Sequence, residues 1–436
     1  MKKSTLCVPK ALLQACAVGG IALCGWGGGV AQAQDADFTQ KLSGTWGGLR
    51  SKLFSEGLDF EVNDQNEYWG VPVGGSQPSN NYIGATTAAL TLDLHTLTGL
   101  ALGQLHVSAM DIRGRPFSNT PLYVFNQVSG IEADDNLRLY ELWYNQSFWH
   151  ERFDVLVGKL DLSHDFMSSD MAQNFLNASF SWPMLPDNNL YDQGPTSPLA
   201  TPAVRIKYHP NAHWTVLAAV GDDNPIGAGF YNENDPWNQN QDPSGTRFHF
   251  GTGALLFFEM QYHRQDPVYE GTFKLGGYGD TGRFPEQGNA ATTHKGNWAL
   301  YGVADQVVAK LQGATRLGVF VRATGTAAAD RNQIVYGLDA GVVLTAPFQR
   351  QNDAVGLGWG VGAPSGVLAR AARRTGQMVQ GNEYHFELTY QYQPYAWLLV
   401  QPDIQGIIAP SGGVPDNTGA RVRNEAIFGI HSSVSF

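Results

Sequence analysis

The chain has 436 residues, with 39 acidic and 28 basic side chains and a formal net charge of -11. Charged residues make up 15%, against about 25% in ordinary soluble domains, and glycine is frequent at 51 residues. Beyond the N-terminus no apolar run is long enough for a transmembrane helix, and the negative charge argues against a nucleic-acid partner.

The N-terminus has the pattern of a secretory signal peptide. Lys2 and Lys3 precede a small, apolar stretch over 11–23, and Ala-Gln-Ala at 31–33 fits a cleavage site. We predict that residues 1–33 are removed, which takes away all three cysteines (Cys7, Cys16 and Cys24) and leaves no disulfide or thiolate metal site. A lipid anchor on Cys24 is the alternative, and Leu23 disfavours it because a small residue is needed there.

Residues 34–57 are expected to form an N-terminal periplasmic arm with a short helix over 51–58. From 58 to 436, segments with period-two patterning recur, rich in β-branched and aromatic residues, and about sixteen strands are predicted. We place them near 58–67, 83–97, 100–112, 137–148, 153–162, 203–209, 213–221, 253–263, 269–279, 296–307, 315–324, 334–346, 354–362, 381–393, 396–408 and 421–436.

The connections alternate in length. Those at 98–99, 149–152, 210–212 and 394–395 are tight, whereas 113–136, 163–202, 222–252, 280–295, 363–380 and 409–420 are long and polar. Short turns at one end and long loops at the other are typical of a bacterial outer-membrane barrel. We therefore predict an all-β, transmembrane antiparallel β-barrel with short periplasmic turns and long extracellular loops.

Within the strands, polar and apolar side chains alternate. Glu383, His385 and Glu387 alternate with Tyr384 and Phe386. The same pattern sets Thr91, Asp93 and His95 against leucines, and Arg316 and Arg322 against Leu317, Val319 and Val321. A closed barrel hides its apolar face in lipid and leaves no backbone group unpaired there. The chain ends on Phe436, on an alternating last strand.

Several stretches together carry a family resemblance: WGGLR at 46–50, LRLYELWY at 137–144, VGK at 157–159, PAVR at 202–205, YGVADQ at 301–306, QPDIQ at 401–405 and PSGG at 410–413. With them the chain resembles the carbohydrate-selective outer-membrane porin family (OprB type) over nearly all its mature length. The resemblance implies a sixteen-stranded barrel, surrounded by lipid and lipopolysaccharide in the outer membrane of a Gram-negative bacterium. Glucose and other monosaccharides would diffuse through it without energy coupling or chemistry. It further implies that two loops, for which 113–136 and 163–202 are the candidates, fold inward, and that Phe436 is read by the barrel-assembly machinery.

A sugar-selective bore needs donors and acceptors for hydroxyl groups, and arginine offers a planar fork of five donors. By residue type and resemblance, the expected pore-lining residues are Arg113, Arg138, Glu141, Trp143, Arg205, Lys207, Arg316 and Arg322. Arg138 and Glu141 are three positions apart, so strict alternation would place them on opposite faces. Either a bulge intervenes, or one residue lies in a loop, or one is misassigned.

Other kinds of site find little support. Gly277, Gly279 and Gly282 match a nucleotide-binding spacing, but no helix pattern follows them, and the histidines form no metal-binding motif. We expect no cofactor, no metal and no enzymatic activity. The alternatives are a general or cation-preferring porin, an outer-membrane barrel enzyme, or a soluble secreted β-protein. Whether the barrels form homo-oligomers stays open.

Overall fold

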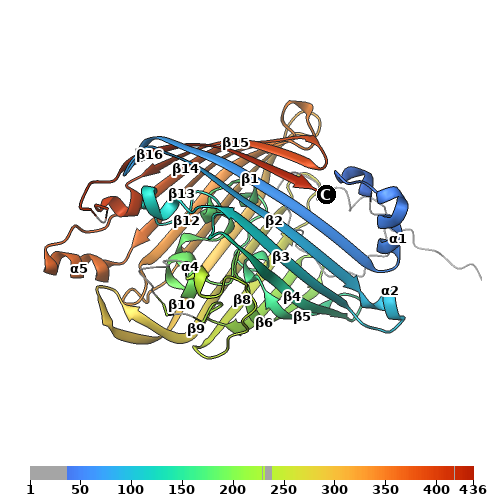
Figure 1. Cartoon of the computed structure of the whole chain (residues 1–436), viewed down its shortest axis with the longest axis horizontal. Helices are drawn as coiled ribbons and strands as arrows, with labels where there is room; N and C mark the ends of the chain where they lie inside the picture. Colours follow the sequence, from blue (N-terminus) through green and yellow to red (C-terminus); the bar gives the residue numbers. More distant parts are fainter. Residues whose placement is uncertain (1–36, 228, 231–237, 417) are drawn as a thin grey trace, which may run out of the picture.

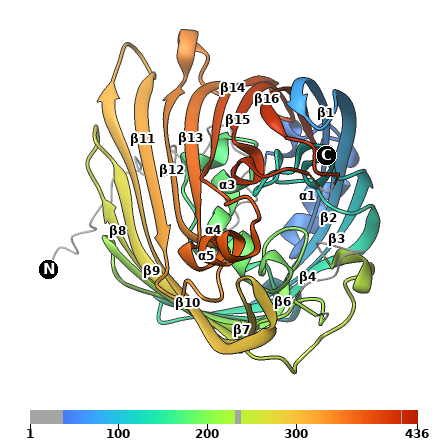
Figure 2. The ribbon, with the colours of Figure 1, turned by 90° about the vertical axis from the view of Figure 1, so that its left-hand side faces the viewer.

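The computed structural model describes residues 37–436 except 228, 231–237 and 417, so the predicted signal peptide over 1–33 lies outside the described residues. In the described part, the strands close into one antiparallel barrel in which β1 pairs with β16 (Figures 1 and 2). They are β1 Leu58–Gly75, β2 Ser79–Asp93, β3 Gln104–Gly114, β4 Asn136–Phe148, β5 Phe153–Leu160, β6 Thr201–Asn211, β7 Trp214–Asp222, β8 Ala254–Arg264, β9 Gly271–Glu286, β10 Asn289–Lys310, β11 Arg316–Gly325, β12 Ile334–Thr345, β13 Ala354–Pro364, β14 Glu383–Tyr395, β15 Leu398–Ile408 and β16 Arg423–Ser435. Among these residues, no helix is both long and apolar enough to cross a membrane.

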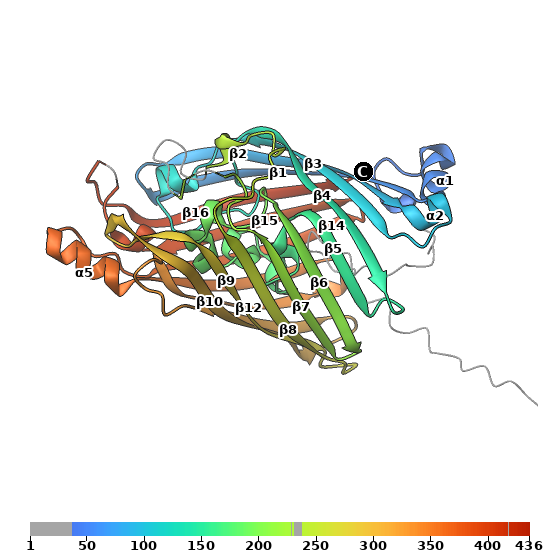
Figure 3. The same cartoon turned by 90° about the horizontal axis from the view of Figure 1, so that it is seen from below.

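The barrel has two different ends, seen at opposite sides of Figures 1 and 3. The long-loop end carries the connections 115–135, 161–200, 223–253, 365–382 and 409–422, and the helix α5 (Gly366–Thr375). The short-turn end carries the brief connections 149–152, 212–213 and 396–397, together with α1 (Leu49–Ser55), α2 (Leu94–Thr98) and the C-terminus. The predicted alternation of short and long connections is therefore confirmed in its main lines.

Three local expectations are wrong. Residues 280–295 form a hairpin instead of a loop, because β9 and β10 continue pairing up to a turn at 287–288. The first strand does not end at 67 but runs on to Gly75. The second strand stops at Asp93, whose carboxylate accepts hydrogen bonds from the backbone N–H groups of His95 and Thr96 and caps α2. His95 consequently lies in a helical turn, and not on a strand face.

The predicted alternation of faces is confirmed. On β14, Glu383, His385 and Glu387 point inward and are buried, whereas Phe386 and Leu388 point outward and are 41% and 48% exposed. An apolar outer surface over a polar interior is the arrangement that a lipid bilayer requires of a barrel.

The loop 161–200 folds into the barrel, where its short helices α3 (Ala178–Ser181) and α4 (Met184–Asn189) lie inside the ring of strands (Figure 2). Its apolar side chains Leu162 and Phe166 pack against the wall residues Phe257 and Tyr301. The loop 115–135 also turns inward, and its Phe125 belongs to the same buried cluster. The inward course expected for these two loops is confirmed.

Carboxylates on the inner wall hold the backbone of these loops. Glu259 accepts the N–H of Met167 at 3.0 Å, and Glu387 accepts the N–H groups of Leu176 and Asn177 at 2.6 and 2.9 Å. Glu383 accepts the N–H of Phe125 in the other loop. Each bond satisfies a loop amide that no strand partner reaches, which is the condition for burying irregular backbone.

Arg322, expected to line the pore, is fully buried and acts as a clamp instead. It donates to the backbone oxygens of Met167 at 3.0 Å and of Ser179, and pairs with Asp339 at 3.0 Å. Its inward direction follows the predicted alternation, but the loop 161–200 covers it. No solute can reach this guanidinium while the loop is seated.

Replacing Arg322 by methionine is therefore expected to loosen the loop 161–200. Asp339 loses its cation and two carbonyls lose their donor, and breaking a buried pair of this kind costs about 3–5 kcal/mol. Single-channel conductance in planar bilayers should rise and become noisier, and the loop should become sensitive to protease. The matched variant Arg316→Met breaks a half-exposed pair with Glu270, which is worth about 1 kcal/mol at most. Equal effects of the two variants would contradict the clamp.

Candidate functional site

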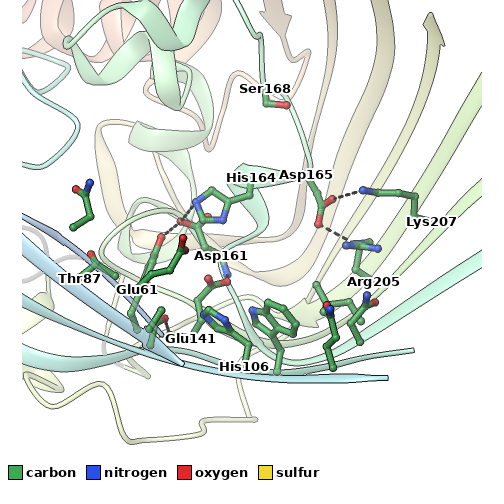
Figure 4. A pocket seen from close by; sticks show the side chains of 18 of the residues that line it. Glu61, Thr87, His106, Glu141, Asp161, His164, Asp165, Ser168, Arg205 and Lys207 are labelled. Atoms are coloured by element: carbon green, nitrogen blue, oxygen red, sulfur yellow. Dashed lines mark hydrogen bonds and ion pairs between the residues drawn. The ribbon is translucent and has the colours of Figure 1, made fainter. Parts of the chain in front are cut away.

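A cavity of about 430 Å³ remains between the inward loop 161–200 and the wall formed by β1 to β9. It reaches toward the short-turn end, where Lys41 of the N-terminal arm and Ser435 of β16 line it. Figure 4 shows its side chains, which come from the loop on one side and from the strands on the other. The space is within the range of volumes of small-molecule sites.

A bulge in β4 brings Glu141 into this cavity. Val107 pairs with Leu142 and Ala109 pairs with Leu139, so both Tyr140 and Glu141 stand opposite the single residue Ser108. The N–H of Glu141 donates to Ser108 Oγ at 3.2 Å. Of the explanations left open for the spacing of Arg138 and Glu141, the bulge is the right one.

The loop presents a short turn to Glu141. Asp161 precedes a 3-10 turn at Leu162–His164 and caps it by accepting the N–H of Ser163 at 2.8 Å. The N–H of Asp161 donates to Glu141 Oε1 at 3.0 Å, and Tyr140 donates its hydroxyl to Asp161 Oδ2 at 2.5 Å. These bonds fix the turn against the bulge of β4, and the imidazole of His164 then lies beside the carboxylates (Figure 4).

The electrostatics of this turn favour a charged His164. Burial disfavours the imidazolium, but the carboxylates of Asp161, Glu141 and Asp165 outweigh burial and raise the pKa of His164 above its ordinary value of 6.5. His164 Nε2 lies 3.7 Å from Asp161 Oδ2.

Asp165 faces two bases on β6. Its carboxylate accepts from Arg205 Nε at 2.9 Å and lies 3.5 Å from Lys207 Nζ, as the dashed lines in Figure 4 mark. Burial acts in the opposite direction, but these two cations hold the pKa of Asp165 below its ordinary value. Arg205 and Lys207 are two positions apart, so the strand places both on its inner face. Arg205 Nη1 is buried and has no hydrogen-bond partner among the described residues.

Trp143 also lines the cavity, stacked on His106. The two ring centroids are 4.5 Å apart at an interplanar angle of 8°, and His106 is in turn hydrogen-bonded to Thr91 at 2.9 Å. Trp143 is only 8% exposed, so it presents little of its ring to the cavity.

Of the eight predicted residues, the structure brings Glu141, Trp143, Arg205 and Lys207 together around the cavity. The other four do not line it. Arg138 is buried beneath the loop 223–253 and donates to the backbone oxygen of Asp242 at 3.2 Å, and Arg316 pairs with Glu270 near the short-turn end. Arg113 lies on the outward face of β3, because the alternation along that strand puts His106 and Ser108 inside.

Several residues that line the cavity were not predicted from the sequence. Lys274 on β9, whose Nζ donates to the backbone oxygen of Ser168 at 2.7 Å, and His106 on β3 both lie on inward positions of alternating strands. Applying the alternation to every polar residue would have found them. Asp161, His164 and Asp165 come from an irregular loop, where no periodic signal indicates direction.

The cavity mixes both signs of charge. Its lining holds the carboxylates of Glu61, Glu141, Asp161, Asp165 and Asp170, the cations of Lys41, Arg205, Lys207 and Lys274, and the imidazoles of His106 and His164. Such a lining offers donors and acceptors to a polar solute without a strong field of one sign.

Comparison with known proteins gives a consistent result. A family model described as carbohydrate-selective porin, OprB family, matches residues 77–436. Porin B of Pseudomonas aeruginosa is 24% identical over 424 residues, which covers 87% of this chain and 89% of that protein. The putative porin QuiX of Acinetobacter baylyi is 20% identical over 405 residues, covering 86% and 89%. The high-pH structure of Pseudomonas putida OprB shares the fold, with a TM-score of 0.78 at 21% identity over 92% of this chain and 100% of that chain.

The ion selectivity of the bore should depend on pH through His164. Because its pKa in the folded protein is raised, the positive charge is complete below the ordinary pKa and is lost as the pH rises through the raised value. The zero-current potential across a salt gradient should therefore move toward cation preference over that range. In His164→Gln this step should disappear, and a step of unchanged size in the variant would contradict the assignment.

Proposed function

The chain belongs to the carbohydrate-selective porin, OprB family, and we propose that Arg205, Lys207, Asp165 and Glu141 form the sugar site of its bore. The protein is a passive diffusion channel for carbohydrates in the outer membrane of a Gram-negative bacterium. The observation that carries the site is the buried Nη1 of Arg205, which has no hydrogen-bond partner among the described residues and lines a cavity of mixed charge.

A monosaccharide is neutral, and each of its hydroxyl groups both donates and accepts. Arg205 keeps one guanidinium nitrogen free for a hydroxyl oxygen, since Asp165 already occupies Nε and fixes the plane of the fork. Asn145 Oδ1 lines the same cavity, is buried and lacks a partner among the described residues, so it supplies an acceptor. Glu141 adds a carboxylate to the lining of the cavity.

The balance of charges favours a neutral solute. A cation would meet Arg205 and Lys207, and an anion would meet Glu141 and Asp161, whereas a sugar replaces bound water by equivalent hydrogen bonds. Binding of this kind stays weak, as conduction requires. In a general or cation-preferring pore, glucose flux would not depend on Arg205.

Catalysis forms no part of this proposal. The carboxylates of Asp161 and Asp165 already have partners in the protein, since Asp161 is bonded to Tyr140 and Ser163, and Asp165 to Arg205. We therefore assign these two carboxylates a structural and a sugar-binding role.

We also propose a role for each end of the chain. Residues 1–33 are a cleaved signal peptide, and 34–57 form an arm at the periplasmic mouth of the barrel domain 58–436. In support, Leu42 donates its N–H to the backbone oxygen of Ser435 at 2.9 Å, and the buried Arg50 donates to that of Phe60 at 2.7 Å. Phe436, whose N–H bonds to the oxygen of Val62 at 2.9 Å, is the residue that the barrel-assembly machinery reads.

Replacing Arg205 by alanine should slow sugar entry. The loss of one charge-assisted hydrogen bond, worth about 1.5–3 kcal/mol, should lower glucose flux in liposome-swelling assays about tenfold or more, while small-ion conductance changes little. Arg264→Ala removes an exposed arginine at the short-turn end of β8 and serves as the control. If both variants pass glucose like the wild type, the site is wrong.

Removing the last aromatic side chain should impair assembly and leave transport by assembled barrels intact. We expect Phe436→Ala to reduce the amount of heat-modifiable barrel in outer-membrane fractions, with Ser435→Ala close to the wild type. Glucose flux per folded barrel should be equal in both. Normal barrel levels in Phe436→Ala would count against the role of this residue.

A further inference from the structure

Two cations lie side by side on the hairpin of β9 and β10, at the long-loop end of the barrel. Arg283 on β9 is the cross-strand partner of Lys295 on β10, and both side chains are exposed. Arg283 follows Leu275 and Thr281 on the exposed alternate positions of β9, whereas the neighbouring Phe284 is fully buried. The two cations, called the outer cation pair below, therefore lie on the outer surface of the barrel.

The outer cation pair has no counter-ion in the described part of the chain. Neither Arg283 nor Lys295 forms an ion pair there. Glu286 and Asp330, at the same end of the barrel, lie 3.3 and 3.5 Å from the imidazole of His294 instead. Like charges directly opposite each other on adjacent strands destabilise a sheet, so an anion from outside the protein would relieve their repulsion.

The outer cation pair lies where the apolar belt of the outer wall ends. On β9 the exposed ring of Phe273 marks the short-turn side of this belt, and Arg283 comes ten positions later. With a rise of about 3.4 Å per residue and a strand tilt of about 40°, this separation is roughly 25 Å across the membrane, the usual height of the apolar band of such barrels. The exposed Trp298 and Leu300 on β10 belong to the belt between these two levels.

An open groove of about 480 Å³ adjoins the outer cation pair. Its lining is mainly apolar and consists of Trp298, Ala327, Ala328, Ala329, Asp330, Arg331 and Val367. Arg331 joins the groove to the hairpin, because its Nη1 donates to the backbone oxygens of Lys295 and Gly296 at 2.9 and 2.7 Å. Two cations beside an apolar groove suit a ligand that has both a phosphate and an apolar part.

The helix α5 adds more positive charge at this end. Its side chains Arg370, Arg373 and Arg374 are exposed and form no ion pair with a described residue. The helix packs against the tip of the hairpin, since a β-carbon on Gly288 would lie 2.3 Å from that of Ala371. Figures 1 and 3 show α5 at the extreme long-loop end. In a chain with a net charge of -11, this concentration of cations favours an anionic partner at that end.

We propose that the outer cation pair binds a phosphate group of lipid A, the membrane anchor of lipopolysaccharide, and that the groove beside Trp298 holds an apolar part of the same molecule. The phosphates of the outer leaflet lie where the hydrocarbon layer ends, which is the level of the pair. The fork of Arg283 and the ammonium of Lys295 are both suited to phosphate oxygens. A soluble acidic protein would have no use for an apolar groove at lipid level.

Binding of lipid A to the folded barrel in mild detergent tests this site. We expect the wild type to bind bisphosphorylated lipid A at least tenfold more tightly than lipid A without phosphates. Arg283→Ser/Lys295→Ser should lose this difference. The exchange Arg283→Lys/Lys295→Arg keeps both charges and should bind like the wild type. Arg264→Ser/Lys310→Ser, which removes two exposed cations at the short-turn end, is the matched control and should also bind normally.

Equal binding of bisphosphorylated lipid A by the wild type and the double serine variant would overturn the proposal. A wild type that binds both forms of lipid A equally would do so as well. Inorganic phosphate equimolar with lipid A should not displace it, and displacement would indicate a site for free anions instead of a lipid site. Every variant should keep the heat-modifiable mobility of a folded barrel and wild-type glucose flux per barrel, so failure of this proposal leaves the sugar site unaffected.

Discussion

The interior of this barrel depends on wall carboxylates that accept hydrogen bonds from loop backbone. Glu259 and Glu387 hold the loop 161–200, and Glu383 holds the loop 115–135. Without these acceptors, the loop amides would be buried with neither water nor a strand to bond, at a cost of about 1–3 kcal/mol each. The two loops stay inside the barrel because the inner wall supplies charged acceptors for their backbone N–H groups, and they fill part of the bore.

The inner polar residues therefore divide into two groups that look alike in sequence. One group, including Arg322, binds the inward loops and is buried, so solutes do not reach it. The other, including Arg205 and Glu141, lines the cavity. Because the loop brings its own charges, with His164 and Asp165 facing the bases and acids of the wall, the selective lining belongs to the loop as much as to the barrel.

The outer surface of the barrel differs from the bore. Side chains that face lipid are apolar, as Phe258 and Leu388 illustrate, whereas side chains that face water in the bore are polar. One strand, β3, thus contributes to both environments, with His106 toward the bore and Arg113 away from it.

The sequence by itself determined the barrel, the approximate places of most strands and the alternation of faces, because period-two patterning and loop lengths are local and repeat many times along the chain. The family resemblance came from its short motifs. It placed Arg205 and Lys207 on the inner face of the barrel, where the structure also has them, since both lie on one regular strand. Only the tertiary structure decided the rest. Arg113 was assigned to the wrong face because a strand end gives too few residues to fix its phase, and Arg322 was assigned to the bore because a loop far away in sequence covers it. The bulge that turns Glu141 inward is set by pairing with Ser108, which no local pattern in β4 records.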